Sequence, residues 1–248
     1  MSTLILNGSP KKKLSMSRYI QKTVKVMLGS KDVKECTLRN KSEIPHALEQ
    51  LKGIDSLVIT APLYIDSIPS QLLAFLKEAE DFCEKEGCHF NVYVLLNSGF
   101  IEGHQNEYAL AQYECWAERA GLSWGGGVGI GGGVILGFYT LEIPIAFLEF
   151  MISLITNASS GMPLISQEMI STLLGNLGMF LFLSSGMFIC EWLIARRINK
   201  QRLGKNLFTR FMCPTLLFFI CADIFMLILC IFKGGIFRNI FHREVIQE

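Results

Sequence analysis

Candidate strands and amphipathic segments alternate along the first part of the chain. β-rich runs end at or near residues that interrupt regular structure, such as Gly8 and Pro62. Other segments repeat apolar residues at close to helical spacing, and Gly121 has the position of a helix C-cap. The candidate strands are residues 3–7, 33–38, 55–61 and 90–96, and the candidate helices are residues 15–28, 47–51, 69–86 and 106–120. This alternation predicts βαβ units.

A glycine-rich stretch and one more apolar segment complete this first part. Residues 124–133 contain seven glycines. Residues 138–155 are helix-like, and we expect this segment to form the last helix that covers the sheet. Repeated βαβ units imply right-handed crossovers and a parallel sheet. We predict a five-stranded, doubly wound, three-layer α/β sandwich over residues 1–160. In such sheets ligands bind beyond the carboxyl ends of the strands, so the loops after the first, third and fourth strands carry the candidate chemistry.

Charge and hydropathy divide the chain into two parts. Half of the residues are hydrophobic and only 18% are charged, which is low for a wholly soluble protein. Charges are dispersed up to about residue 121, whereas residues 175–195 and 211–232 are nearly uncharged. Each stretch reaches the roughly 20 residues that a membrane-spanning helix needs. We therefore predict a membrane-associated helical region over residues 161–248. The formal net charge of +1 gives no general attraction to nucleic acid.

The membrane topology stays open at this stage. A carboxylate near the middle of the second stretch, Asp223, has to face protein, water or a partner. The segment between the stretches is basic, with no acidic residue, which favours the cytoplasmic side. Its basic residues are Arg196, Arg197, Lys200, Arg202, Lys205 and Arg210. A plain two-helix hairpin from a cytoplasmic domain would place this segment outside.

Two arrangements would avoid that conflict. One is a third crossing within residues 134–156, which Glu142, Pro144 and Glu149 weaken and which would use the expected last helix of the sheet. The other is a re-entrant or interfacial pair of apolar segments, with the basic segment on anionic head groups.

The cysteines and the N-terminus indicate a cytoplasmic location for the soluble part. The eight cysteines form no CxxC pair and no zinc or iron–sulfur spacing, so we expect free thiols and no metal site. The first residues lack a basic region followed by a long apolar run, so we expect no signal peptide. Free thiols are typical of the cytoplasm.

The first loop, residues 7–18 with the sequence NGSPKKKLSMSR, has the features of a phosphate site. Gly8 permits a tight turn, and Lys11 adds a cation. A helix N-terminus also offers unpaired N–H groups and a partial positive charge. The loop lacks the glycines of a Walker or GxGxxG motif. The hydroxyl groups around the expected helix start belong to Ser9, Ser15 and Ser17.

The loops after the third and fourth strands could contact a planar ligand. Residues 61–70 read APLYIDSIPS, and Tyr64 could present its ring for stacking or simply pack the loop. Residues 97–105 read NSGFIEGHQ, in which Gly99 permits close approach of the backbone to a ring edge. Glu102 and His104 are acid–base candidates, although a solvated loop is the favoured interpretation for both.

Four motifs together resemble the NAD(P)H-dependent FMN reductase branch of the flavodoxin-like superfamily. These are GSP, PLYIDSIPS, NSGFIEGHQ and VGIGGG, and their order and spacing are respected over residues 3–160. The resemblance implies a flavodoxin-like sandwich with FMN as cofactor and NAD(P)H as electron donor. The chain departs from the family at the helix start, where Ser-Met-Ser replaces Asn-Thr or Ser-Thr. It also lacks the cysteine cluster of the iron–sulfur flavoproteins, so we expect no cluster.

The resemblance implies three groups of cofactor-binding residues. Ser9, Ser15, Ser17 and Arg18, with Lys11, would surround the FMN phosphate; Pro62, Leu63, Tyr64 and Ile65 would face one side of the isoalloxazine ring; Asn97, Ser98, Gly99 and Phe100 would meet its polar edge. Because the chemistry would occur at the flavin, no catalytic side chain is required.

The expected function is that of a membrane-tethered, flavin-dependent oxidoreductase, with its redox domain on the cytoplasmic side of the cell membrane. Electrons would pass from NAD(P)H through FMN to a small acceptor, for which a quinone is attractive because the anchor would hold the cleft near lipid. The alternatives are a non-catalytic or electron-relay module serving a membrane partner, and a redox domain that regulates a membrane protein bound by the apolar helices. Relatives of this fold often dimerise across the cleft, so a homodimer is expected.

Overall fold

The structure is a computed structural model, which describes residues 1–12, 15–29, 32–160, 163 and 165–232, with only the backbone for residues 138–143. The chain forms two compact units, Met1–Met212 and Cys213–Glu248. The division predicted at residue 160 concerns membrane association, and it remains a prediction.

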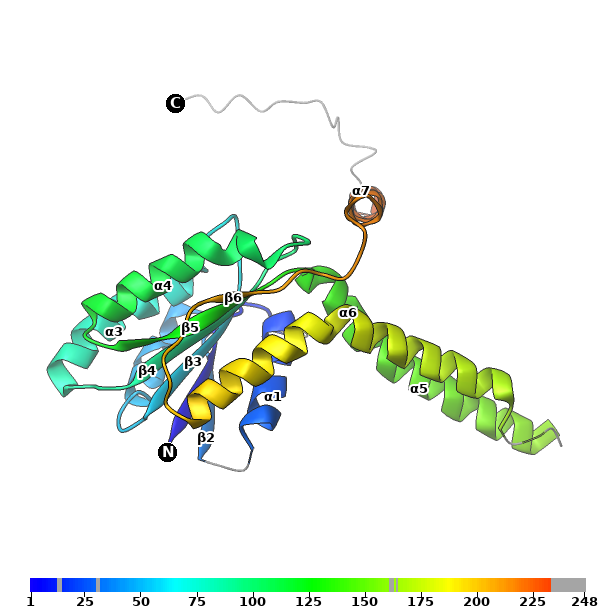
Figure 1. Cartoon of the computed structure of the whole chain (residues 1–248), viewed down its shortest axis with the longest axis horizontal. Helices are drawn as coiled ribbons and strands as arrows, with labels where there is room; N and C mark the ends of the chain where they lie inside the picture. Colours follow the sequence, from blue (N-terminus) through cyan, green and yellow to red (C-terminus); the bar gives the residue numbers. More distant parts are fainter. Residues whose placement is uncertain (13–14, 30–31, 161–162, 164, 233–248) are drawn as a thin grey trace, which may run out of the picture. The chain divides into compact units, whose positions relative to one another are not determined.

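A parallel six-stranded sheet forms the centre of the first unit (Figure 1). Its order is β2-β1-β3-β4-β5-β6. The 2-1-3-4-5 order of the first five strands is that of flavodoxin-like folds, so the predicted fold class is confirmed. The strands are β1 (Thr3–Asn7), β2 (Val33–Thr37), β3 (Ser56–Pro62), β4 (Asn91–Asn97), β5 (Ser123–Ile130) and β6 (Leu207–Phe208).

The sixth strand is the difference from the prediction of five. It pairs Leu207 with Val128 and Phe208 with Gly129 at the edge of the sheet. Two residues are too few to show a period in the sequence, so the pairing could not be predicted from the pattern. An ion pair of 3.1 Å between Arg210 and Glu102 fastens the segment that follows β6.

Helices cover both faces of the sheet and complete the three layers. Figure 1 shows α3 and α4 on one face and α1 and α6 on the other. The helices that match the predicted ones are α1 (Met16–Leu28), α2 (Ile44–Glu49), α3 (Ser70–Glu86) and α4 (Glu107–Arg119), with short 3-10 helices η1 (Lys41–Glu43) and η2 (Gly103–Asn106). The core between α3, α4 and the sheet contains the fully buried Phe75 and Tyr113.

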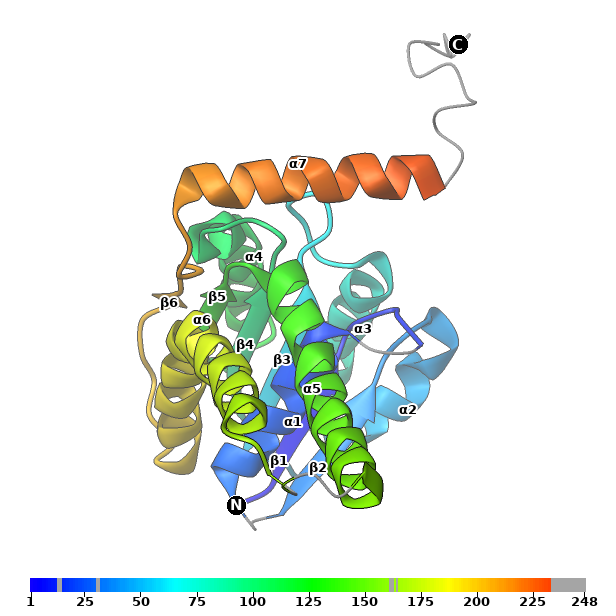
Figure 2. The same cartoon turned by 90° about the vertical axis from the view of Figure 1, so that its right-hand side faces the viewer.

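The prediction for the last helix of the sheet was wrong. α5 (Gly133–Ser160) and α6 (Gln167–Asn199) instead form a hairpin, and they run side by side in Figures 1 and 2. The C-terminal half of α6 packs against α1 and β5 through buried residues that include Met187, Ile194 and Ile198. Residues 175–195 are apolar enough for a membrane span, and composition alone does not distinguish a span from a core helix.

Among the described residues, two helices are long and apolar enough to cross a membrane by length and composition, α6 and α7 (Thr215–Phe232). Within the most apolar window of each, 28% of α6 is buried inside the protein but only 6% of α7. A helix in the core of a soluble protein passes the same test, so this finding alone is weak evidence of a membrane. Asp223 of α7 is exposed.

Candidate functional site

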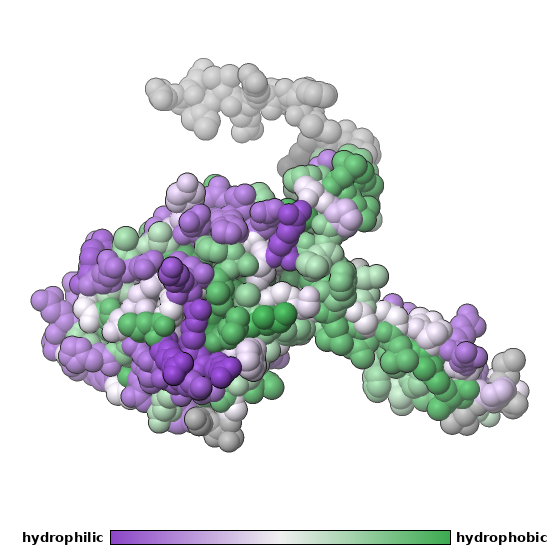
Figure 3. Space-filling view, viewed as in Figure 1, coloured by the Kyte–Doolittle hydropathy of each residue, from purple (hydrophilic) through white to green (hydrophobic). Residues whose placement is uncertain are grey.

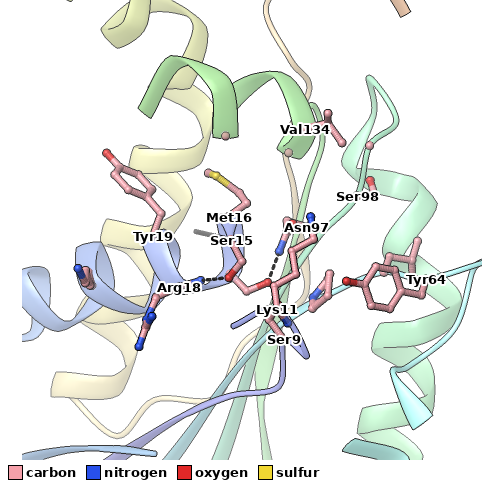
Figure 4. Close-up of a pocket in the computed structure, with 17 residues that line it drawn as sticks. Ser9, Lys11, Ser15, Met16, Arg18, Tyr19, Tyr64, Asn97, Ser98 and Val134 are labelled. Carbon is pink, nitrogen blue, oxygen red and sulfur yellow. Dashed lines mark hydrogen bonds between the residues drawn. The ribbon is translucent and has the colours of Figure 1, made fainter. Parts of the chain in front are cut away.

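A cavity of about 410 Å³ lies at the carboxyl ends of β1, β3 and β4 (Figure 4). This is where ligands bind in doubly wound sheets, and the volume suits a cofactor-sized molecule. The described residues that line it are Ser9, Lys11, Ser15, Met16, Ser17, Arg18, Tyr19, Lys22, Pro62, Leu63, Tyr64, Asn97, Ser98, Gly99, Gly133, Val134 and Gly137.

The N-terminus of α1 forms one wall of the cavity. The hydroxyl oxygen of Ser15 caps the helix, accepting from the backbone N–H of Arg18 at 3.2 Å. Ser15, Arg18, Tyr19 and Lys22 follow the i, i+3, i+4, i+7 spacing, which places them on one face of the helix. Because the N-terminus of α1 lies at the cavity, the positive end of the helix dipole is directed toward it.

The charge of the lining is positive. Lys11, Arg18 and Lys22 line the cavity, and none of the described lining residues is acidic. Together with the cap and the Ser9 and Ser15 hydroxyls, these cations make this end suitable for an anion such as a phosphate.

Asn97 ties three loops together behind the cavity. Its side-chain amide donates to the hydroxyl of Ser17 at 2.8 Å and to the carbonyl of Ala61 at 3.0 Å. Its backbone carbonyl accepts from the N–H of Leu63 at 2.9 Å. Ser17 and Asn97 are both buried. They therefore fix the shape of the wall.

A two-residue turn carries Tyr64 at the opposite side of the cavity from Tyr19 (Figure 4). The backbones of Tyr64 and Ser67 exchange two hydrogen bonds, of 3.1 and 3.0 Å, around Ile65 and Asp66. Both turn residues have positive φ, 47° and 56°. Tyr64 is partly exposed, and burial raises the pKa of its hydroxyl. Pro62 and Leu63, just before it, line the same cavity.

The loop after β4 and the start of α5 approach each other closely. The N–H of Gly133 donates to the carbonyl of Ser98 at 2.7 Å, and the N–H of Ser98 donates to the carbonyl of Ile130 at 3.0 Å. A Cβ on Gly133 would lie 2.9 Å from the Ser98 carbonyl oxygen, so the contact needs glycine. This contact places Val134 on the rim of the cavity.

Eleven of the thirteen predicted binding residues line the cavity, and Ile65 and Phe100 do not. Ile65 is 99% exposed and Phe100 is 49% exposed, so their predicted ring contacts have no support from their position. The lining residues that the sequence analysis missed are Met16, Tyr19, Lys22, Gly133, Val134 and Gly137. Helical spacing from Ser15 could have found Tyr19 and Lys22, but Val134 and Gly137 depend on the direction of α5.

Glu102 and His104 lie outside the cavity lining. The ring of His104 stacks on Phe208 with centroids 4.1 Å apart, and Glu102 pairs with Arg210. These contacts fasten η2 to the segment around β6, so both residues have structural partners. In the part of the chain that the structure describes, no three His, Cys, Asp or Glu side chains gather to hold a metal ion, and all eight cysteines are free.

Comparison with known proteins yields structural neighbours of low sequence identity. No family model and no curated protein matches the sequence. Trp repressor binding protein from Bacillus subtilis has a TM-score of 0.44 and 16% identity, covering 53% of this chain and 85% of that one. NAD(P)H:quinone oxidoreductase from Methanothermobacter marburgensis has a TM-score of 0.44 and 15% identity, and the match covers 53% of this chain and 84% of that one. FMN-dependent NADH-azoreductase from Bacillus anthracis, in complex with FMN, has a TM-score of 0.37 and 16% identity, and the match covers 50% of this chain and 86% of that one. Similarity at this level carries no argument about ligands.

Proposed function

We propose that the cavity binds FMN and that the chain is a membrane-associated, NAD(P)H-dependent oxidoreductase. The observation that carries the proposal is the division of one cavity into a cationic, hydroxyl-lined end and an aromatic end. The fold adds its support, because the cavity lies where doubly wound sheets bind nucleotides. The resemblance of the four loop motifs to FMN reductases names the nucleotide.

The first end of the cavity fits the phosphate of FMN. Ser9 and Ser15 supply hydroxyl groups, and Lys11 and Arg18 supply charge. The first turn of α1 supplies backbone N–H groups with the favourable end of the helix dipole. No described acidic side chain opposes a doubly charged phosphate in the lining.

The second end fits a planar ring. Tyr64 offers an aromatic face, and Pro62 and Leu63 extend that apolar wall. On the other side, Gly99 and Val134 leave room for a flat group, since glycine adds no side chain there. The hydrogen bonds of Asn97 hold these walls in place before any ligand arrives.

A bound flavin would supply the redox chemistry, accepting a hydride from a nicotinamide and passing electrons to an acceptor. The protein side chains would bind the phosphate, stack on the ring and exclude water from one face. We propose a lipid-soluble quinone as the acceptor, because the apolar helices would hold the cavity near a membrane that stores it.

An absorbance spectrum of the detergent-purified full chain tests the proposal, followed by anaerobic addition of NADH or NADPH. Oxidised-flavin bands that bleach with nicotinamide are the expected result. Bound flavin without bleaching would favour an electron-relay module instead. Colourless protein that takes up no added FMN would overturn the proposal.

A further inference from the structure

The hairpin of α5 and α6 has the polarity of a structure surrounded by lipid. Figure 3 shows its shaft as mainly apolar and its tip as more polar. In a water-soluble hairpin, apolar side chains lie between the helices and polar ones face outward. Here the outward-facing side chains are apolar as well.

The outward face of α5 is apolar. Ile145, Phe147, Leu148, Met151, Ile152 and Ile155 are each 41–68% exposed. The residues that face α6 include Glu149 and Ser153, which line a cavity of about 310 Å³ between the two helices. Ala146 and Phe150 line the same cavity, so the side of α5 toward α6 is mixed, whereas its outward face is apolar.

An apolar stripe also runs along the distal half of α6. Ile170, Leu174, Leu177 and Leu181 form an exposed stripe with helical spacing. Glu168 and Thr172 line the cavity that Glu149 and Ser153 also line. A carboxylate at membrane depth is tolerated best where it faces protein or a polar cavity, and this cavity provides such a place.

The lengths also fit a bilayer. A Cβ on Gly186 would lie 3.6 Å from Thr209, so α6 reaches the domain at about this residue. The free part, residues 167–183, is about 26 Å long at 1.5 Å per residue. It is near the lower limit of about 17 residues for a membrane-spanning helix. The tip carries Asn157, Ser159, Ser160 and Ser166, which suit a polar interface and not hydrocarbon.

We propose that this hairpin crosses the lipid bilayer, with its tip on the side opposite to the domain. The proposal rests on the membrane association in the proposed function, but not on the flavin. The hairpin leaves the domain at Gly133 and returns to it at about Gly186, so both ends stay on one side. The basic residues 196–210 follow the return and belong to the same compact unit as the sheet.

This path removes the topological conflict found in the sequence. The basic segment and the redox domain occupy the same side of the membrane, as the positive-inside rule requires for a cytoplasmic domain. The third crossing considered in residues 134–156 no longer competes with the sheet, because the C-terminal half of α6 supplies its last helix.

The same path brings the candidate FMN site to the membrane surface. Gly137 lines the cavity, and Ile145 of the exposed apolar face lies eight residues further along α5. Eight helical residues span about 12 Å. A lipid-soluble acceptor would therefore have only a short path from the bilayer to the site.

Thiol labelling of the full chain tests the crossing. Ser159→Cys marks the tip, and Lys200→Cys marks the basic segment; both positions are exposed. Cells that express each variant are treated with a membrane-impermeant maleimide before and after permeabilisation, and the unsubstituted chain gives the background of native cysteines. We expect the two added thiols to react from opposite sides of the membrane. Labelling of both from the same side would overturn the proposal.

A second measurement separates lipid from a protein partner. Phe147→Trp places a tryptophan on the outward face of α5, and Tyr108→Trp places one on the exposed surface of α4. In vesicles with brominated acyl chains, we expect strong quenching at position 147 and little at position 108. No quenching at 147, with a dimer in solution, would mean that a second copy covers the hairpin and would overturn the proposal. Flavin spectra of these variants test the proposed function separately.

Discussion

The side-chain amide of Asn97, at the end of β4, donates a hydrogen bond of 2.8 Å to the hydroxyl of Ser17 in the first turn of α1. This bond joins residues 80 positions apart and connects two of the three loops around the candidate site. Ser17 and Asn97 have polar groups suited to a ligand, but the structure pairs them with each other. Their contribution to binding is therefore the shape of the cavity.

Replacement of Asn97 should weaken both the fold and the site. The Asn97→Ala variant loses the bonds to Ser17 and Ala61 and leaves a buried hydroxyl and carbonyl without this donor. We expect a loss of about 1–3 kcal/mol in the free energy of unfolding. Thermal unfolding in detergent measures it, and Gln105→Ala removes an exposed amide from the same loop as the control. Equal stability of the two variants would contradict this role.

Tyr64→Ala tests the aromatic wall. If the ring stacks on a flavin, its loss should weaken FMN binding by about 2- to 13-fold, since aromatic stacking contributes about 0.5–1.5 kcal/mol. Tyr64→Phe keeps the ring and should bind nearly as well as the parent chain. Titration with FMN, followed by flavin fluorescence, gives the affinities. An unchanged affinity in Tyr64→Ala would remove the stacking role.

The turn at Ile65 should be strained. A β-branched residue at a φ of 47° lies in the left-handed region, and Ile65 is 99% exposed, with little packing to compensate. Asparagine tolerates this region, so Ile65→Asn should raise stability by about 1 kcal/mol. Thermal unfolding measures the gain. Val26→Asn, at an exposed position inside α1, is the matched control and should show none. A lower stability for Ile65→Asn would show that the side chain has a stabilising contact.

The sheet and most of the cavity lining could be predicted because local patterns encode them. Strands such as residues 55–61 are rich in apolar and β-branched residues, and their carboxyl ends meet at one edge, which brings Ser9, Tyr64 and Asn97 together. The glycines of residues 124–133 stand out in the sequence, but the local pattern does not explain why they are needed. The structure supplies a reason: a Cβ on Gly129 would lie 2.4 Å from the carbonyl oxygen of Gly103.

The features that escaped prediction depend on long-range packing. β6 has two residues and no period, and its place is decided by pairing with β5. The distal half of α6 belongs to the hairpin, and its C-terminal half is the last helix on the sheet. The apolar sequence continues from one half into the other, so hydropathy could not separate them. The hydrogen bond between Asn97 and Ser17 could not be read from either segment alone.

Glu191 is a buried acidic residue in the C-terminal half of α6, the half that packs against α1 and β5. Its side chain is fully buried, and within the described residues neither carboxyl oxygen has a hydrogen-bond partner. The neighbouring hydroxyl of Thr23 donates to the carbonyls of Tyr19 and Ile20. Burial raises the pKa of Glu191 from 4.5 to about 8.

This pKa predicts a pH dependence of stability. Between pH 4.5 and about 8 the folded state keeps the proton of Glu191 and the unfolded chain loses it. The folded state then binds more protons, so the free energy of unfolding falls as the pH rises through this range and levels off above it. Glu191→Gln cannot ionise, so the Tm of this variant minus that of the parent should grow from pH 5 to pH 8 and then stay constant. The exposed Glu118→Gln is the control and should follow the parent at every pH. Parallel profiles for Glu191→Gln and the parent would mean that the buried carboxyl finds a partner in solution and that α6 docks less tightly on α1 than the structure shows.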